Sequence, residues 1–349
     1  MKNYCVKGYY ALSGRMANGC RECVKGEKLV LFITGLCANK CFYCPLPVEM
    51  RGRDLVMANE RPVRKDSDLI NEALSMRALG AGFTGGEPLL VIDRVIHYIK
   101  LLKNKFGKSF HIHLYTAMPG ISDSTLKALD KAGLDELRIH PVNLSKSYWP
   151  LIKKALNYSF DVGVEVPALP GRLSELKELA DYLNSVKAKF LNINELELTE
   201  PNYNSLKGLG YCFDKDLVSA KGSRSTALKL IDYAKKLKLS VYYCSAGLKD
   251  AVQFRERLKR TAKQTAKPYE LITSDGTLIK GVIKGSIGAL RKLAKDYHLK
   301  AYLNKTKQRL ELSVNKVESL SKLVDGLEFG VLESYPTFGK PMINYSRLK

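Results

Sequence analysis

The sequence predicts an α/β fold over most of the chain, followed by a small α+β domain. Between residues 28 and 244, short apolar runs rich in β-branched and aromatic residues alternate with longer amphipathic stretches. Strands that alternate with helices form a parallel sheet with crossover helices. Beyond residue 267 the pattern changes to a hairpin followed by mixed elements. The length of 349 residues and the 45% hydrophobic content suit one large and one small globular domain.

The first predicted strand, 28–34, is rich in Leu, Val, Phe and Ile and is bounded by glycines. Apolar β-type runs predict the later strands at 81–84, 111–116, 136–140, 161–166, 190–198 and 240–244. Amphipathic periodicity predicts helices at 68–79, 91–105, 123–132, 149–158, 173–187 and 225–237. The first six strand–helix units therefore cover about residues 28–238.

In the last part of the chain, Asp275-Gly276 separates two strand-like runs, 270–274 and 277–283, which is a strong hairpin signal. The pattern then predicts a helix at 286–297, a strand at 310–314, a helix at 316–323 and a strand at 327–333. We therefore expect three segments, which are a cysteine-containing N-terminal segment (1–27), a large α/β domain (28–266) and a small α+β domain (267–349).

Three cysteines, Cys37, Cys41 and Cys44, lie close together just after the first strand. A [4Fe–4S] cluster normally takes four thiolates, so three clustered ones leave one iron open to another ligand. An open iron indicates catalysis. A structural zinc site, which more usually combines two C-x2-C pairs about 15–20 residues apart, is the alternative.

Cys37, Cys41, Tyr43 and Cys44 complete the motif C-x3-C-x-aromatic-C, and Gly85-Gly86-Glu87-Pro88 follows downstream. With these two motifs in this order the chain resembles the radical S-adenosylmethionine (SAM) enzymes. The resemblance implies a partial (β/α)6 TIM-like barrel. It also implies that the three thiolates hold a [4Fe–4S] cluster whose open iron chelates SAM, and that reductive cleavage gives a 5′-deoxyadenosyl radical.

The same resemblance assigns further SAM contacts. Gly85, Gly86 and Glu87 would meet the methionine ammonium group, and Tyr43 would lie near the adenine, although an aromatic beside cysteines can serve packing alone. Barrel enzymes place their chemistry at the C-terminal ends of the strands. In the family the fourth to sixth strands line the ribose and adenine. The residues expected there are Arg138, Glu165 and Asn194.

Three histidines also lie near strand ends. His111 and His113 belong to the third strand and His140 follows the fourth. Alternation along a strand does not show which face points inward, so a hydrogen-bonded core role is as acceptable as a site role.

Five cysteines lie outside the cluster motif. Cys20 and Cys23 form a C-x2-C pair, and Cys5 and Cys244 are the best further donors for a second metal site with zinc or an auxiliary cluster. The alternative is a pair of surface thiols, or a disulfide that forms only on oxidation. Cys212 is expected to be an ordinary buried thiol.

The charge is strongly basic, with 57 Lys and Arg against 35 Asp and Glu and a formal net charge of +22. Positive charge is dense at 255–267 and 291–307. Such an excess predicts a polyanionic partner such as RNA, or an anionic membrane surface, although a solvated helix face explains any single charge run. No signal peptide, lipidation motif or apolar run of membrane-spanning length is apparent, so we expect no membrane partner and a cytoplasmic location.

The leading hypothesis from sequence is a radical SAM enzyme that modifies RNA, either tRNA or rRNA, with an electron donor such as ferredoxin or flavodoxin. The alternative is a protein-directed enzyme, either a glycyl-radical activase or a peptide modifier. A non-catalytic metal- or RNA-binding protein is a third. Sequence segments such as Leu-Gly-Ala-Gly-Phe-Thr-Gly-Gly-Glu-Pro-Leu resemble those of a mainly archaeal branch of the radical SAM enzymes, which is described as related to pyruvate formate-lyase activating enzymes. That resemblance does not identify the substrate.

Overall fold

The computed structural model describes residues 8–349. They form two compact units, of which the first includes Ala78–Gln253 and the residues before Leu74, and the second includes Leu74–Arg77 and Phe254–Lys349. The sequence predicts residues 255–266 in the α/β domain, but helix α10 (Arg255–Thr265) groups with the second unit. The reason is its close packing on the hairpin, where a Cβ at Gly276 would lie 2.5 Å from the backbone nitrogen of Lys259.

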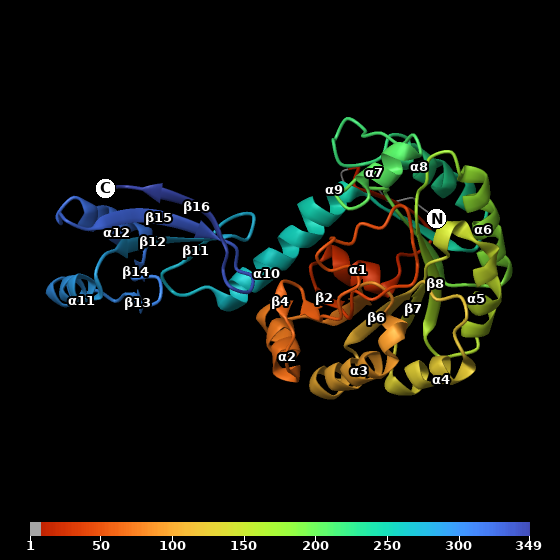
Figure 1. The fold of residues 1–349 in the computed structure, drawn as a ribbon, viewed down its shortest axis with the longest axis horizontal. Helices are drawn as coiled ribbons and strands as arrows, with labels where there is room; N and C mark the ends of the chain where they lie inside the picture. Colours follow the sequence, from red (N-terminus) through yellow and green to blue (C-terminus); the bar gives the residue numbers. More distant parts are fainter. Residues whose placement is uncertain (1–7) are drawn as a thin grey trace. The chain divides into compact units, whose positions relative to one another are not determined.

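The first unit contains a ten-stranded sheet that curls into a partial barrel (Figure 1). Seven neighbouring strands are parallel, which confirms the predicted α/β barrel architecture. They are β2 (Lys28–Phe32), β5 (Gly80–Thr84), β6 (His111–Thr116), β7 (Glu136–Ile139), β8 (Asp161–Pro167), β9 (Phe190–Asn194) and β10 (Ser240–Cys244).

Three short antiparallel strands extend this sheet and were not predicted. Strand β1 (Tyr10–Ser13) pairs with β10 at one edge. At the other edge β3 (Met57–Ala58) pairs with β2, and β4 (Arg61–Pro62) pairs with β3. These segments are too short to show a clear period of two in the sequence.

Helices surround the sheet on its outer side (Figure 1). Helix α4 is typical, because Ser122 caps its first turn, Leu126 and Leu129 face the core, and Gly133 ends it in the left-handed conformation. The main helices are α2 (Asp66–Ser75), α3 (Ile92–Phe106), α4 (Asp123–Ala132), α5 (Trp149–Ala155), α6 (Leu173–Ser185), α7 (Tyr203–Gly208) and α8 (Ser223–Ala234). Short helical segments are Pro88–Val91, Val142–Leu144, Lys146–Tyr148, α9 (Ala246–Leu248) and Lys249–Phe254.

Helix α1 (Asn18–Val24) lies inside the barrel rather than around it, where it contacts β2, β5 and β6 (Figure 1). Its second residue, Gly19, makes this possible. A Cβ at that position would lie only 2.6 Å from Arg138 Nη2 and 2.6 Å from His113 Nδ1. The backbone N–H of Gly19 donates to the carboxylate of Glu136. Helix α1 therefore closes the floor of the barrel.

The second unit is an antiparallel sheet in the order β13-β14-β12-β15-β16, with β11 paired to β12. The predicted hairpin at Asp275-Gly276 is confirmed, with Gly276 at φ +84°. Helices α11 and α12 cover one face through Leu290, Leu293, Val317 and Leu320. The elements are β11 (Leu271–Ile272), β12 (Leu278–Lys284), α11 (Ile287–Asp296), β13 (Tyr302–Asn304), β14 (Arg309–Leu312), α12 (Val314–Ser321), β15 (Glu328–Ser334) and β16 (Met342–Arg347).

Among residues 8–349, no helix has both the length and the apolar character needed to cross a lipid bilayer.

Candidate functional site

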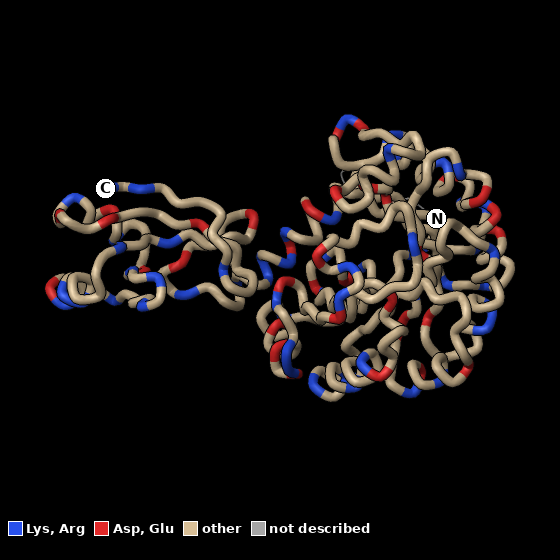
Figure 2. The backbone as a smooth tube through the Cα atoms, in the orientation of Figure 1, with Lys and Arg blue, Asp and Glu red and all other residues tan. Residues whose placement is uncertain are grey.

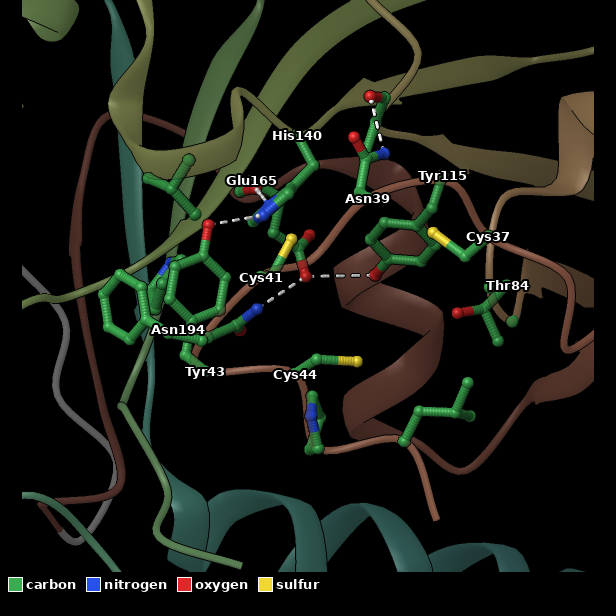
Figure 3. Close-up of a pocket in the computed structure, with 18 of the residues that line it drawn as sticks. Cys37, Asn39, Cys41, Tyr43, Cys44, Thr84, Tyr115, His140, Glu165 and Asn194 are labelled. Atoms are coloured by element: carbon green, nitrogen blue, oxygen red, sulfur yellow. Dashed lines mark hydrogen bonds between the residues drawn. The ribbon is translucent and has the colours of Figure 1, made fainter. Parts of the chain in front are cut away.

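A cavity of about 720 Å³ opens at the C-terminal ends of the parallel strands (Figure 3). Most of the residues predicted from sequence as site residues line it. These are Cys37, Tyr43, Cys41, Cys44, Gly85, Gly86, Glu165 and Asn194. The cavity is also lined by His140 and Tyr115. Arg138 and Glu87 lie outside its lining.

The cysteine loop is fixed by its backbone. Gly35 N–H donates to the carbonyl of Arg53, and Gly52 N–H donates back to the carbonyl of Gly35. The guanidinium group of Arg51 donates to the carbonyl oxygen of Cys44 at 2.8 Å. The loop is thus held at both ends and next to its third cysteine. Arg51 is not among the site residues predicted from the sequence.

The three thiols of this loop are free and face the cavity (Figure 3). Cys37 is exposed, whereas Cys41 and Cys44 are partly buried. Burial, with a smaller contribution from the neighbouring thiols of Cys44 and Cys37, raises the pKa of Cys41 to about 11. Three soft donors on one short loop, beside a cavity that can admit a further ligand, fit an iron–sulfur cluster with one open iron.

The Gly-Gly-Glu-Pro turn joins the end of β5 to the root of the cysteine loop. Gly86 N–H donates to the carbonyl of Thr34, and Glu87 N–H donates to the carbonyl of Leu36. A Cβ at Gly86 would lie 2.3 Å from the oxygen of Leu36, so only glycine permits this approach.

The carboxylate of Glu87 is directed into the protein. It accepts hydrogen bonds from the backbone N–H of Leu89, the hydroxyl of Thr116 and the backbone N–H of Ala117. Its exposed fraction is only 2%. The contact of this carboxylate with SAM therefore stays a prediction, and it would require the exchange of one of these bonds.

Tyr43 and His140 form a hydrogen-bonded pair in the cavity wall. His140 Nδ1–H donates to the backbone carbonyl of Glu165 at 2.8 Å, so its Nε2 accepts from the Tyr43 hydroxyl at 2.9 Å. Burial lowers the pKa of His140, which keeps the ring neutral. The ring of Tyr43 packs with Leu169 and Leu196. Tyr43 thus has a packing role here, and its predicted place near the adenine is not tested.

Glu165 is held at the cavity floor by four donors. One carboxylate oxygen accepts from the Tyr115 hydroxyl and the Asn194 amide, and the other accepts from Arg138 and the Asn192 amide. Burial alone raises the pKa of Glu165, but the charge of Arg138 and these hydrogen bonds outweigh it and bring the pKa below its ordinary value. The carboxylate is therefore charged and fixed in orientation.

Arg138 lies below the cavity and orients Glu165 from beneath. Its Nη1 is 2.8 Å from Glu165, and its Nε is 2.6 Å from Glu136. His111 and His113 also lie outside the cavity lining, where His111 Nδ1 accepts a hydrogen bond from the buried ammonium group of Lys28. Of the three histidines considered from sequence, only His140 lines the cavity.

Lys249 was missed by the sequence reasoning. It lines the cavity and forms an ion pair with Glu197, which follows β9. In the sequence, Lys249 is marked only by its place five residues after the end of β10. That place indicates a site residue only if one knows how the barrel continues after the sixth strand.

Cys20 and Cys244 are both buried in one cluster with Tyr10, Tyr242 and Leu248, and Cys23 lies on the same helix as Cys20. Cys5 falls outside the described residues. No three His, Cys, Asp or Glu side chains within residues 8–349 already stand at metal-ligand spacing. The expectation for Cys212 is wrong, because this thiol is exposed in the loop after α7 rather than buried.

Comparison with known proteins places this site in a family. The model of the radical SAM superfamily matches residues 31–166, and a domain of unknown function (DUF8061) matches residues 276–348. A Methanocaldococcus jannaschii protein is 44% identical over 279 residues, which cover 77% of this chain and 74% of that protein. Its provisional name is glycyl-radical enzyme activating enzyme.

Two solved structures show weaker likeness. Streptococcus suis SuiB bound to S-adenosylmethionine is 14% identical with a TM-score of 0.44, over 63% of this chain and 50% of SuiB. Escherichia coli coproporphyrinogen III oxidase, a radical SAM enzyme, is 13% identical with a TM-score of 0.40, over 64% of this chain and 57% of the oxidase. The chain thus spans half of the SuiB structure and slightly more than half of the oxidase structure.

The sequence matches agree with the thiol loop, the Gly-Gly-Glu-Pro turn and the cavity between them. The cofactors that this family uses are a [4Fe–4S] cluster and SAM, and the three thiols beside the cavity suit them. The 44% identity to the M. jannaschii protein extends over about three quarters of both chains. The chain therefore belongs to the radical SAM superfamily and is an enzyme of that class.

Proposed function

We propose that this chain is a protein-directed radical SAM enzyme of the glycyl-radical-activating type. The observation that carries the proposal is the 44% identity to a protein named as an activating enzyme, over most of both chains. This relative favours the alternative hypothesis over RNA modification, which the basic charge had suggested.

The roles of the chain's own residues follow from the cavity. Cys37, Cys41 and Cys44 would hold the cluster, and the backbone of Gly85 and Gly86 would face SAM. When bound there, the reduced cluster supplies one electron that splits SAM into methionine and a 5′-deoxyadenosyl radical, which takes a hydrogen atom from the substrate. For a glycine substrate, the Cα–H bond breaks, 5′-deoxyadenosine forms and the radical remains on Cα.

Glu165 would orient the nucleoside part of SAM. A carboxylate offers about four acceptor positions, and in this chain four donors occupy them. A ribose hydroxyl would therefore replace the Tyr115 hydroxyl or the Asn194 amide, the two donors that themselves line the cavity. Arg138 and Asn192 would keep the carboxylate in place during this exchange.

The electron donor would be a small acidic redox protein such as ferredoxin or flavodoxin. The formal charge of +22 favours encounter with an acidic partner. This is a proposal about the class of partner and not about a docking site.

The test measures 5′-deoxyadenosine from reconstituted protein, SAM and dithionite, with desalted extract of the source organism. One portion of extract is treated with ribonuclease and another with a protease that is then inactivated. We expect protease to abolish the stimulation of 5′-deoxyadenosine formation and ribonuclease to leave it unchanged. Electron paramagnetic resonance of the stimulated sample should show a radical split by one α-hydrogen. The reverse pattern of sensitivity would favour RNA as the substrate.

The matched control is the variant Cys37→Ala, Cys41→Ala, Cys44→Ala in the same extract. It should form no 5′-deoxyadenosine, because the cluster has lost its thiolates. Cys212→Ala removes an exposed thiol outside the cavity and should retain the activity.

A further inference from the structure

The barrel floor contains a second group of thiols that the proposed reaction does not use. Cys20 and Cys23 lie on α1, and Cys244 is the last residue of β10. All three are free thiols. Cys20 and Cys244 are each only 7% exposed and pack in the same cluster. Two segments from opposite ends of the first unit thus bring their cysteines together.

Polar side chains donate hydrogen bonds to these sulfur atoms. Arg138 Nη2 lies 3.4 Å from Cys20 Sγ, and Asn192 Nδ2 lies 3.2 Å from the same sulfur. Gln253 Nε2 lies 3.8 Å from Cys244 Sγ. N–H donors around sulfur stabilise the negative charge of metal-bound thiolates, and they tune thiolate-held clusters. A cysteine that only fills a core packs as a small hydrophobe and needs no such donors.

One buried polar atom beside these thiols lacks a hydrogen-bond partner among residues 8–349. It is the side-chain oxygen of Asn192, whose amide nitrogen donates to the Cys20 sulfur. Asn192 is only 1% exposed. An unpaired buried polar group is unfavourable, so its presence next to the thiols points to a further ligand at this place.

We propose that Cys20, Cys23 and Cys244 hold a thiolate-ligated metal centre, either zinc or an iron–sulfur cluster, beneath the SAM cavity. Three thiolates leave one coordination position for a further ligand. The centre fastens α1, the floor of the barrel, to the end of β10. It is separate from the cluster on Cys37, Cys41 and Cys44, and it does not depend on the proposed substrate.

Loading requires the side chains to turn toward the metal. No three described side chains stand at ligand spacing, and this holds for the Cys37, Cys41 and Cys44 loop as well as for the floor thiols. Rotation about χ1 moves a sulfur atom between staggered positions without a change in the backbone.

The experiment uses full-length protein carrying Cys37→Ala, Cys41→Ala and Cys44→Ala, so that any remaining bound metal belongs elsewhere. One sample is loaded with Zn²⁺ and another with ferrous iron and sulfide under anaerobic conditions, and both are desalted and analysed for metal. We expect about one zinc, or one cluster, per chain. Addition of Cys20→Ala and Cys23→Ala should remove it, whereas addition of Cys212→Ala should not. The arm that retains stoichiometric metal identifies the centre, and absence of metal in both arms overturns the proposal.

A second measurement replaces the double alanine change by one conservative substitution. Co²⁺ is titrated into the same triple variant, and the thiolate-to-cobalt charge-transfer absorption is recorded. Saturation at about one equivalent, with weaker absorption after Cys244→Ser, supports the centre. A titration without charge-transfer absorption, or one that Cys244→Ser leaves unchanged, contradicts it. Neither readout involves SAM cleavage, so failure here is distinct from failure of the proposed activity.

Discussion

At the scale of single residues, the barrel interior assigns roles that residue identity alone does not reveal. Glu87 belongs to the Gly-Gly-Glu-Pro motif, yet three donors of the protein itself occupy its carboxylate. Glu165 belongs to no motif, yet it lines the cavity as a fixed charge. The number and position of the hydrogen-bond donors around each carboxylate determine whether it is directed into the protein, as in Glu87, or faces the cavity, as in Glu165.

Tyr43→Phe should lower the free energy of unfolding by about 1–2 kcal/mol. The change keeps the packed ring but leaves His140 Nε2 and the backbone N–H of Asn143 without the hydroxyl that pairs with them. Urea denaturation of the cluster-free protein measures the effect. Tyr203→Phe is the control. Tyr203 packs against the same group of hydrophobic residues as Tyr43, and its hydroxyl makes no hydrogen bond to any residue from 8 to 349. Equal losses in both variants would contradict the prediction.

Lys28→Met should change how the free energy of unfolding varies with pH in the alkaline range. Burial lowers the pKa of Lys28 to about 8 from an ordinary value of 10.5, even with Glu22 at 3.1 Å. Between those two values the unfolded chain holds a proton that the folded chain has released, so a rise in pH favours the folded state. Wild type should gain up to about 3 kcal/mol across this window relative to Lys28→Met.

Urea denaturation of both proteins at about pH 7.5 and about pH 10 tests the Lys28 prediction. The difference between the two proteins isolates Lys28, because the other titrating groups are common to both. Parallel pH dependences would show that Lys28 keeps its proton in the folded state.

At the scale of elements, α1 is the least expected part of the fold. A seven-residue helix inside a barrel has little amphipathic signal, since its surroundings include charged as well as apolar groups. Gly19 donates a backbone hydrogen bond to Glu136 and lies against the side chains of Arg138 and His113. The sulfur of Cys20 accepts a hydrogen bond from Asn192. The same helix carries the C-x2-C pair, so its position decides whether that pair is a surface feature or part of the barrel floor.

Gly19→Ala should destabilise the first unit by about 1–3 kcal/mol. The added methyl group would meet Arg138 Nη2 and His113 Nδ1 at 2.6 Å, and either α1 or these side chains must move. Gly208→Ala, at the end of α7, is the matched control because a Cβ there meets nothing within 4 Å. Thermal or urea unfolding compares the two. If Gly19→Ala proved as well tolerated as Gly208→Ala, α1 would not lie in the barrel floor as described.

At the scale of the whole molecule, the excess of basic residues is dispersed. Figure 2 shows Lys and Arg along both units with acidic residues among them. In the second unit, buried Lys280 is paired with Glu270 and Glu311, so part of the positive charge is neutralised within the fold. A net charge of +22 predicts attraction to polyanions but does not define a binding site for one.

RNA should therefore bind this chain by electrostatic attraction alone, without stimulating SAM cleavage. We expect affinity for an arbitrary RNA duplex to fall steeply and linearly on a plot of log affinity against log salt. The same RNA should leave the rate of 5′-deoxyadenosine formation unchanged, within about twofold. Fluorescence anisotropy at several salt concentrations and the nucleoside assay measure the two quantities. Stimulation by RNA that survives moderate salt would favour the RNA-modification hypothesis instead.

The sequence by itself determined the chemistry and the order of the elements. The spacing of Cys37, Cys41 and Cys44 and the Gly-Gly-Glu-Pro turn are local patterns, and so are the alternating apolar and amphipathic runs that predicted the parallel strands. Local patterns are readable because a few neighbouring residues suffice to define a loop, a turn or a strand. The hairpin at Asp275-Gly276 was readable for the same reason.

Only the tertiary structure decided which groups meet. The donors around Glu165 come from β6, β7 and β9, and the pair of Lys249 with Glu197 joins the helical segment after β10 to the segment after β9. The position of α1 and the thiols of Cys20 and Cys244, which are far apart in sequence, depend equally on closure of the barrel. Such contacts arise from packing between distant segments, and no pattern within one segment encodes its partner.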